Sequence, residues 1–168
     1  MRGIAFLIER VVGAAGVLAA LMLVPLVVAT CFEVWSRYVL GAPTAWAYEV
    51  GYILTGSHFM LGLAYTLRAG EHIRIDVFSI RFPLRVRALL DLATYAIMLA
   101  LLAWLSWALL GYMLEAFARG ERSGQSALNL PVWPYRTVFV LSFGLLALQV
   151  FAELLKAWDR LTIPGRAQ

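Results

Sequence analysis

The sequence has few of the residues from which soluble enzymes and metal sites are built. Only 14% of its 168 residues are charged, whereas about a quarter are charged in a typical soluble domain. It has two histidines and a single cysteine, Cys31, which excludes a Cys/His metal motif and a disulfide within the chain. We also find no phosphate-binding loop, hydrolytic constellation or internal repeat. These absences predict a protein that is not an enzyme and has no metal or cofactor.

Apolar residues, in contrast, are abundant and lie in long runs. Hydrophobic residues make up 62% of the chain, and the mean hydropathy is +0.81. The uncharged runs 11–32 and 92–114 correspond to helices of about 33 Å or more, enough to cross a hydrocarbon core of about 30 Å. We therefore predict an all-α integral membrane protein, a single membrane domain over 1–168. Its four transmembrane helices are expected at about 5–36, 45–67, 84–118 and 131–159.

Prolines and glycines indicate where these helices bend, begin and end. Pro25 removes one backbone hydrogen bond within the first run, which predicts a kink near Leu21. Residues 41–44 predict a turn before the second helix. Residues 72–77 alternate between polar and apolar, which favours a short interfacial segment between helices. A signal peptide is disfavoured because the first run is long and no cleavage site precedes a polar domain.

Basic residues are distributed unequally between the two ends of the predicted helices. The termini and the loop 68–87 together carry 10 Lys and Arg residues, whereas the loops 33–49 and 119–136 carry 4. The positive-inside rule then predicts that both termini face the cytoplasm. The net charge of +4 is explained by this asymmetry beside anionic lipid headgroups. No basic groove or RNA-binding motif indicates a nucleic-acid partner.

The second predicted helix carries small and polar residues on one face. Gly51, Thr55, His58 and Gly62 are three or four residues apart, a spacing that allows another helix to approach closely. That helix belongs either to this chain or to a partner subunit. His58 is the only ionisable residue deep within a predicted span, so no buried ion site is expected. A haem would need a second facing histidine, and His72 lies in a loop.

Charged and aromatic residues also gather at the helix ends. Arg37, Trp46 and Glu49 lie at one membrane boundary. A pair of Arg37 with Glu49 would join the first helix to the second, or the same residues would face another protein. Water or headgroups are expected to reach Glu49 there. Lys156, near the end of the last helix, is interpreted as a snorkelling side chain.

These clusters follow one another in an order that resembles a known family. The residues are Arg37-Tyr38, Pro43, Trp46-x-x-Glu49, Gly62, Arg68-x-Gly70-x-His72-Ile73-x-x-Asp76, and Ser126-x-Leu128-x-x-Pro131 with Trp133 and Tyr135. Over about 33–135, this order resembles the small membrane subunit of tripartite ATP-independent periplasmic (TRAP) transporters. The chain departs from the family pattern at Tyr48, because two adjacent acids often follow the tryptophan. In residues 137–142 it also lacks a proline that the family commonly has in the last helix.

The resemblance implies a non-catalytic scaffold subunit of a secondary transporter that imports organic acids, usually with sodium. It implies a multi-pass protein of the bacterial inner membrane. The implied partners are a large multi-span transport subunit, a periplasmic substrate-binding protein and the lipid bilayer. Candidate partner-interface residues are Arg37, Tyr38, Trp46, Glu49, Gly51, Thr55, His58, Gly62, Gly70, His72, Asp76, Ser126, Pro131 and Tyr135.

Two other functions remain as alternatives at this point. A membrane anchor of a respiratory enzyme would bind haem or quinone and would need paired histidines. A small autonomous exporter would need a carboxylate within the membrane. Glu33 or Glu49 would then have to lie deeper than their positions near the helix ends predict.

Overall fold

The structure is a computed structural model that describes residues 2–70, 83–125 and 128–162. Five helices are present in these ranges: α1 (Arg2–Leu21), α2 (Leu23–Tyr38), α3 (Ala47–Ala69), α4 (Leu84–Arg119) and α5 (Trp133–Thr162). Outside the helices, the described residues contain only an isolated antiparallel bridge between Arg122 and Pro131. The prediction of an all-α fold is confirmed.

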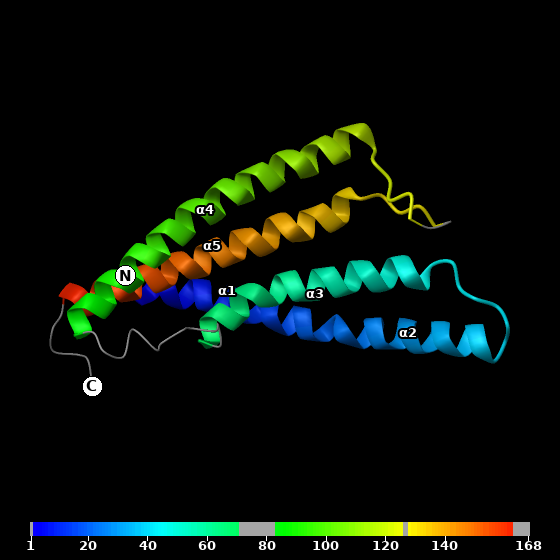
Figure 1. The fold of residues 1–168 in the computed structure, drawn as a ribbon, viewed down its shortest axis with the longest axis horizontal. Helices are drawn as coiled ribbons and strands as arrows, with labels where there is room; N and C mark the ends of the chain where they lie inside the picture. The colour runs from blue at the N-terminus through cyan, green and yellow to red at the C-terminus, as the bar shows by residue number, and fades with distance from the viewer. Residues whose placement is uncertain (1, 71–82, 126–127, 163–168) are drawn as a thin grey trace.

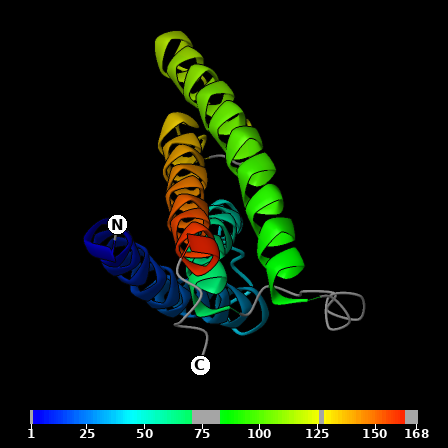
Figure 2. The same cartoon turned by 90° about the vertical axis from the view of Figure 1, so that its left-hand side faces the viewer.

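The helices lie side by side in a fan (Figure 1). α5 packs against α4 on one side and against α3 and α1 on the other, and α2 packs against α3. The start of α1, the end of α5 and the start of α4 lie at the same end of the long axis, which we call the terminal end. The α2–α3 and α4–α5 connections lie at the opposite end, the loop end. Seen from the terminal end, α4 lies at the edge of the fan, against α5 (Figure 2).

The first long helix is broken at Met22, which separates α1 from α2. Pro25 has no N–H to donate to the carbonyl of Leu21, so the regular bonding pattern is interrupted there. Bonding continues on both sides, because Met22 donates to Leu18 at 3.0 Å and Leu26 donates to Met22 at 3.3 Å. The break therefore lies beside Leu21, where the sequence predicts a kink.

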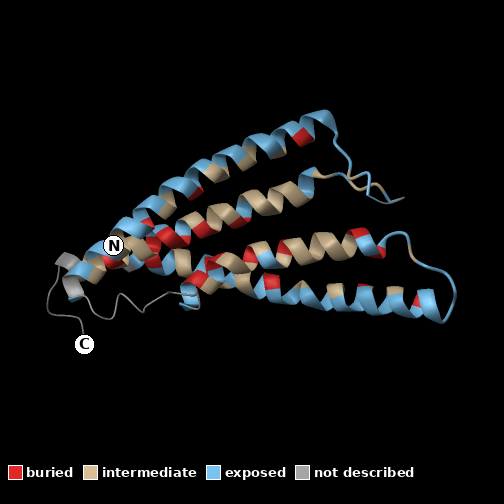
Figure 3. Ribbon diagram, in the orientation of Figure 1, coloured by how far each residue is buried: buried red, intermediate tan, exposed pale blue. Residues whose placement is uncertain are grey.

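The apolar core lies near the terminal end, where the helices converge (Figure 3). Val12 of α1, Ala64 of α3 and Val150 of α5 are fully buried at its centre. α1 comes close to α3 because Gly16 has no side chain. A Cβ added at Gly16 would lie 2.5 Å from Cδ2 of Tyr65 and 2.9 Å from its Cβ.

Three stretches, not the four expected, are long and apolar enough to cross a membrane in the described part of the chain. They are Gly3–Tyr38, Val86–Arg119 and Trp133–Asp159. α3 has 23 residues, so its length would suffice at 1.5 Å per residue. Its hydropathy is lowered by Ser57 and His58 and by further glycine, threonine and tyrosine residues. The expectation of four apolar spans is therefore corrected to three.

The close contact of α1 with α3 generates a prediction for Gly16→Ala. The added methyl group must displace Tyr65, and overpacking of this kind costs about 1–3 kcal/mol. We expect a lower thermal midpoint for the purified subunit in detergent. Gly111→Ala is the matched control, because an added Cβ meets nothing within 4 Å there and the helix-propensity gain is the same. Equal midpoints for the two variants would contradict the packing of α1 on α3.

Candidate functional site

Glu49, in the first turn of α3, is fully buried and holds the α4–α5 loop. Its side chain is 0% exposed. Oε1 accepts a hydrogen bond from the hydroxyl of Ser123 and a second from the backbone N–H of Leu130, at 3.2 Å. A buried carboxyl group is costly unless it is hydrogen-bonded, so these donors make its burial tolerable. We call Glu49, Ser123 and Leu130 the loop clamp.

The α4–α5 loop returns on itself before it reaches α5. The N–H of Ser123 donates to the carbonyl of Leu130 at 2.9 Å, and the N–H of Val132 donates to the carbonyl of Glu121 at 3.0 Å. Asn129 adopts a φ of 48°, a left-handed conformation that asparagine tolerates better than most residues. The two antiparallel segments thereby lie beside the first turn of α3, where Ser123 and Leu130 bind Glu49.

Arg136 of α5 fixes the base of this loop against α4. Its Nη2 donates to Oε1 of Glu121 at 2.8 Å, and its Nη1 donates to the carbonyl of Tyr112 at 3.2 Å. The guanidinium also lies 3.6 Å from the ring centroid of Tyr112, a cation–π contact. Only 12% of the Arg136 side chain is exposed. The loop is therefore held on α5, on α4 and, through the loop clamp, on α3.

The α2–α3 connection is held by another carboxyl group, Glu33. Its Oε2 accepts hydrogen bonds from the hydroxyl and from the backbone N–H of Thr44, the latter at 2.8 Å. Its Oε1 accepts a hydrogen bond from Nε of Arg37 at 2.9 Å. Arg37 thus pairs with Glu33 one turn away on α2.

The structure corrects two interpretations of this region. Of the two readings of Arg37, the pair with Glu49 is not formed in the described residues, because Glu33 lies four residues away on the same helix and accepts from Arg37 instead. Water does not reach Glu49, because the α4–α5 loop covers it. Sequence spacing alone offered no signal for Ser123 and Leu130, which lie 74 and 81 residues from Glu49 along the chain.

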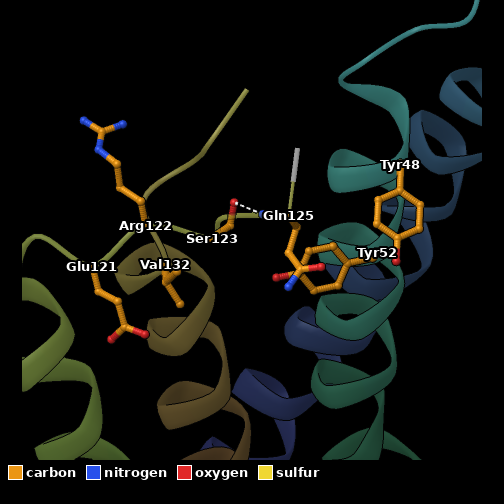
Figure 4. Close-up of a pocket in the computed structure, with 7 residues that line it drawn as sticks. All are labelled: Tyr48, Tyr52, Glu121, Arg122, Ser123, Gln125 and Val132. Carbon is orange, nitrogen blue, oxygen red and sulfur yellow. Dashed lines mark hydrogen bonds between the residues drawn. The ribbon is translucent and has the colours of Figure 1, made fainter. Parts of the chain in front are cut away.

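A pocket of about 380 Å³ opens between α3 and the α4–α5 loop. Figure 4 shows Tyr48 and Tyr52 on α3 at one side and side chains of the loop at the other. The described residues that line it are Tyr48, Tyr52, Glu121, Arg122, Ser123, Gln125 and Val132. It offers phenol, amide, hydroxyl, acidic and basic groups within a small area. Such a surface suits recognition of a polar partner by hydrogen bonds and charge pairs.

Aromatic contacts stabilise the helices beneath these loops. Trp46 stacks on Phe32 with ring centroids 5.9 Å apart, which joins the start of α3 to α2. Tyr135 of α5 lies edge-on to Tyr52 of α3, at 5.5 Å. Its hydroxyl fills the space beside Gly56, where an added Cβ would lie 2.4 Å from it. Trp46 and Tyr135 therefore make contacts within the chain.

The small-residue face of α3 is only lightly covered by the chain's own helices. A Cβ added at Gly51 would reach only Leu26, at 4.0 Å, and one added at Gly62 would meet nothing within 4 Å. Thr55 lines a groove of about 310 Å³ between α2 and α3. The ring of His58 lies 4.3 Å from that of Phe59.

The remaining candidate residues do not form one cluster. Tyr38 is 79% exposed at the end of α2. Gly70 ends α3 with a φ of 74°, so its role here is that of a helix cap. Pro131 takes part in the isolated bridge of the α4–α5 loop. His72, Asp76 and Ser126, together with 72–77, lie outside the described residues.

At the terminal end, a polar network joins α1 to α5. Nζ of Lys156 lies 2.5 Å from Oε1 of Glu9 and 2.7 Å from Oε1 of Glu153. Nε2 of Gln149, which is fully buried, donates to the same Glu153 oxygen at 3.0 Å. Lys156 therefore binds carboxyl groups of two helices. Its spacing from Glu153 was visible in the sequence, but the partner on α1 was not.

Comparison with known proteins gives one family. The model of the tripartite ATP-independent periplasmic transporters, DctQ component, matches residues 26–160, from α2 to α5. A search among curated proteins found no match. No group of three or more potential metal ligands occurs in the parts of the chain that the structure describes. The family match does not support the alternative of a respiratory anchor. The chain belongs to the DctQ component family of TRAP transporters, a family of small membrane subunits.

Proposed function

We propose that this chain is the non-catalytic scaffold of a transporter that imports organic acids. As a DctQ component, it works in a membrane complex with a large membrane subunit and a substrate-binding protein. In the proposed mechanism it packs against the large subunit and keeps part of that subunit fixed in the bilayer. The loop end adds to the surface on which the substrate-binding protein docks. Organic acids as substrates follow from the family resemblance.

The observation that carries this proposal is that hydrogen bonds hold the described residues of both connections at the loop end. The loop clamp, Arg136 and Glu33 hold both connections with polar contacts, and the hydrogen bonds from the loops to Glu49 and Glu33 are half-buried. A docking surface gains affinity when it is already ordered before the partner arrives. Glu121 and Arg122 beside the pocket provide charges of both signs, which would steer a charged soluble partner and make docking sensitive to salt.

We further propose that the loop end faces the periplasm and that both termini face the cytoplasm of a bacterial inner membrane. The count of 10 basic residues against 4 supports this orientation. α3 would lie in the bilayer with the three more apolar spans. Its polar positions support this arrangement because α1, α2 and α5 pack against it and shield part of its surface from lipid.

Co-purification tests the proposed function directly. The tagged chain, expressed with its neighbouring membrane subunit in a bacterial host, should bring down a much larger multi-span protein from mild detergent. Isolation as a stable lone chain, or transport by this chain alone in liposomes, would contradict the scaffold role.

The loop clamp generates a second prediction, for Glu49→Ala. Ser123 and Leu130 lose their acceptor, and a buried group left unsatisfied costs about 1–3 kcal/mol. We expect a lower thermal midpoint, weaker binding of the substrate-binding protein by roughly tenfold, and unchanged substrate preference. Glu115→Ala is the control, because Glu115 pairs with Arg119 on an exposed helix surface, where an ion pair contributes little. A change in substrate preference would show that Glu49 belongs to a substrate site.

The proposed orientation can be checked by cysteine labelling. In a Cys31→Ser background, Gln125→Cys places a thiol in the α4–α5 loop and Pro83→Cys places one at the start of α4. We expect an impermeant maleimide to label the Gln125→Cys variant in intact spheroplasts, and the Pro83→Cys variant only after permeabilisation. The opposite pattern would reverse the orientation, and labelling of both variants from outside would exclude it.

A further inference from the structure

The outer surface of α4 carries two tryptophans near the middle of its apolar run. Trp104 is 70% exposed and Trp107 is 76% exposed. α4 packs along α5 and stands at the edge of the fan (Figure 2). Its side away from α5 is exposed along most of its length (Figure 3). Both indoles therefore project from the bundle.

The depth of these tryptophans in the bilayer follows from the charges that flank them. The uncharged run 92–114 lies between Asp91 and Glu115, and its central residue is 103. At 1.5 Å per residue, Trp104 is about 2 Å and Trp107 about 6 Å from the centre along the helix. The boundary of the hydrocarbon core lies about 15 Å from its centre. Both indoles are thus closer to the bilayer centre than to either boundary.

The bilayer centre is an unfavourable place for an exposed tryptophan. Indoles are enriched at the membrane boundaries, where the ring is apolar and the N–H reaches polar groups. Trp46, Trp133 and Trp158 lie near helix ends in this chain. Neither Trp104 nor Trp107 donates a hydrogen bond to any described residue. An unpaired N–H in hydrocarbon is costly, so a protein surface with an acceptor fits this face better than acyl chains.

The surface of α4 around the two indoles also has a shape against which a second helix can pack. Ile97, Leu101, Trp104 and Gly111 recur at intervals of four, three and seven residues, so they share one side of α4. Trp107 lies beside them on the next turn. A Cβ added at Gly111 would meet nothing within 4 Å, so this glycine leaves a recess next to the large indoles. Large and small residues in this order allow a second helix to interlock with α4.

We propose that these residues of α4 form the intramembrane surface on which the large membrane subunit rests. We call Ile97, Leu101, Trp104, Trp107 and Gly111 the α4 face. A transmembrane helix of the large subunit lies along it, and a carbonyl or hydroxyl oxygen of that helix accepts the indole hydrogen bonds. This inference rests on the proposed scaffold role and names the surface through which the role is performed.

The test compares the double variant Trp104→Leu/Trp107→Leu with Trp158→Leu in the co-expressed complex. Truncation of buried interface tryptophans removes a large part of the binding energy, so we expect recovery of the large subunit to fall roughly tenfold or more. Trp158→Leu also loses one indole, but at a helix end, and should leave recovery unchanged. The isolated double variant should keep the wild-type thermal midpoint, because the α4 indoles are exposed in the lone chain.

Photo-crosslinking at positions 104 and 107 provides a second measurement. With benzoylphenylalanine at either position, we expect a crosslinked product with the large subunit. Crosslinks to lipid alone, together with unchanged recovery for the double variant, would overturn the α4 face as an interface. If the wild-type chain itself recovers no large subunit, the proposed scaffold role fails instead, so the two failures are distinguishable.

Discussion

The buried carboxyl group of Glu49 is the constraint on which the loop end of this protein depends. It joins the first turn of α3 to a loop more than seventy residues later, through one hydroxyl and one backbone N–H. Glu33 repeats the arrangement on α2, where it accepts the hydroxyl and the backbone N–H of Thr44. In both cases a helix supplies the acceptor and a loop supplies two different donors. Each connection is thereby fixed by an acid on a neighbouring rigid element.

The two ends of the molecule are stabilised by different interactions. Near the terminal end the helices converge on small and aliphatic side chains, and Lys156 adds a link between α1 and α5. Toward the loop end α4 stays in contact with α5 through Phe117 and Trp133, whose ring centroids lie 5.5 Å apart, and the connections add polar contacts. This division agrees with a subunit whose loop end receives a soluble partner. Hydrogen bonds can hold the connections of the loop end in place even though the apolar core lies near the terminal end.

The sequence predicts those features that depend on neighbours along the chain. Pro25 predicts the break beside Leu21, and the long apolar runs predict helices throughout. The partners of Glu49 could not be predicted, because helical spacing says nothing about which distant loop returns over a helix. Arg37 illustrates the same limit, since its position left its partner open between Glu49 and another protein, and the structure pairs it with Glu33 one turn away. The low hydropathy of α3 follows from polar residues such as His58, and packing by α1, α2 and α5 shields part of its surface.

The position of α4 at the edge of the bundle also affects the lipid around the protein. α4 packs along α5 and makes no comparable contact with another described helix, so acyl chains cover most of its circumference while the subunit is alone. Acyl chains that lie against a helix surface with protruding side chains have fewer conformations than those of the free bilayer. A second protein on the same side of α4 releases these chains, so assembly gains conformational entropy from the lipid.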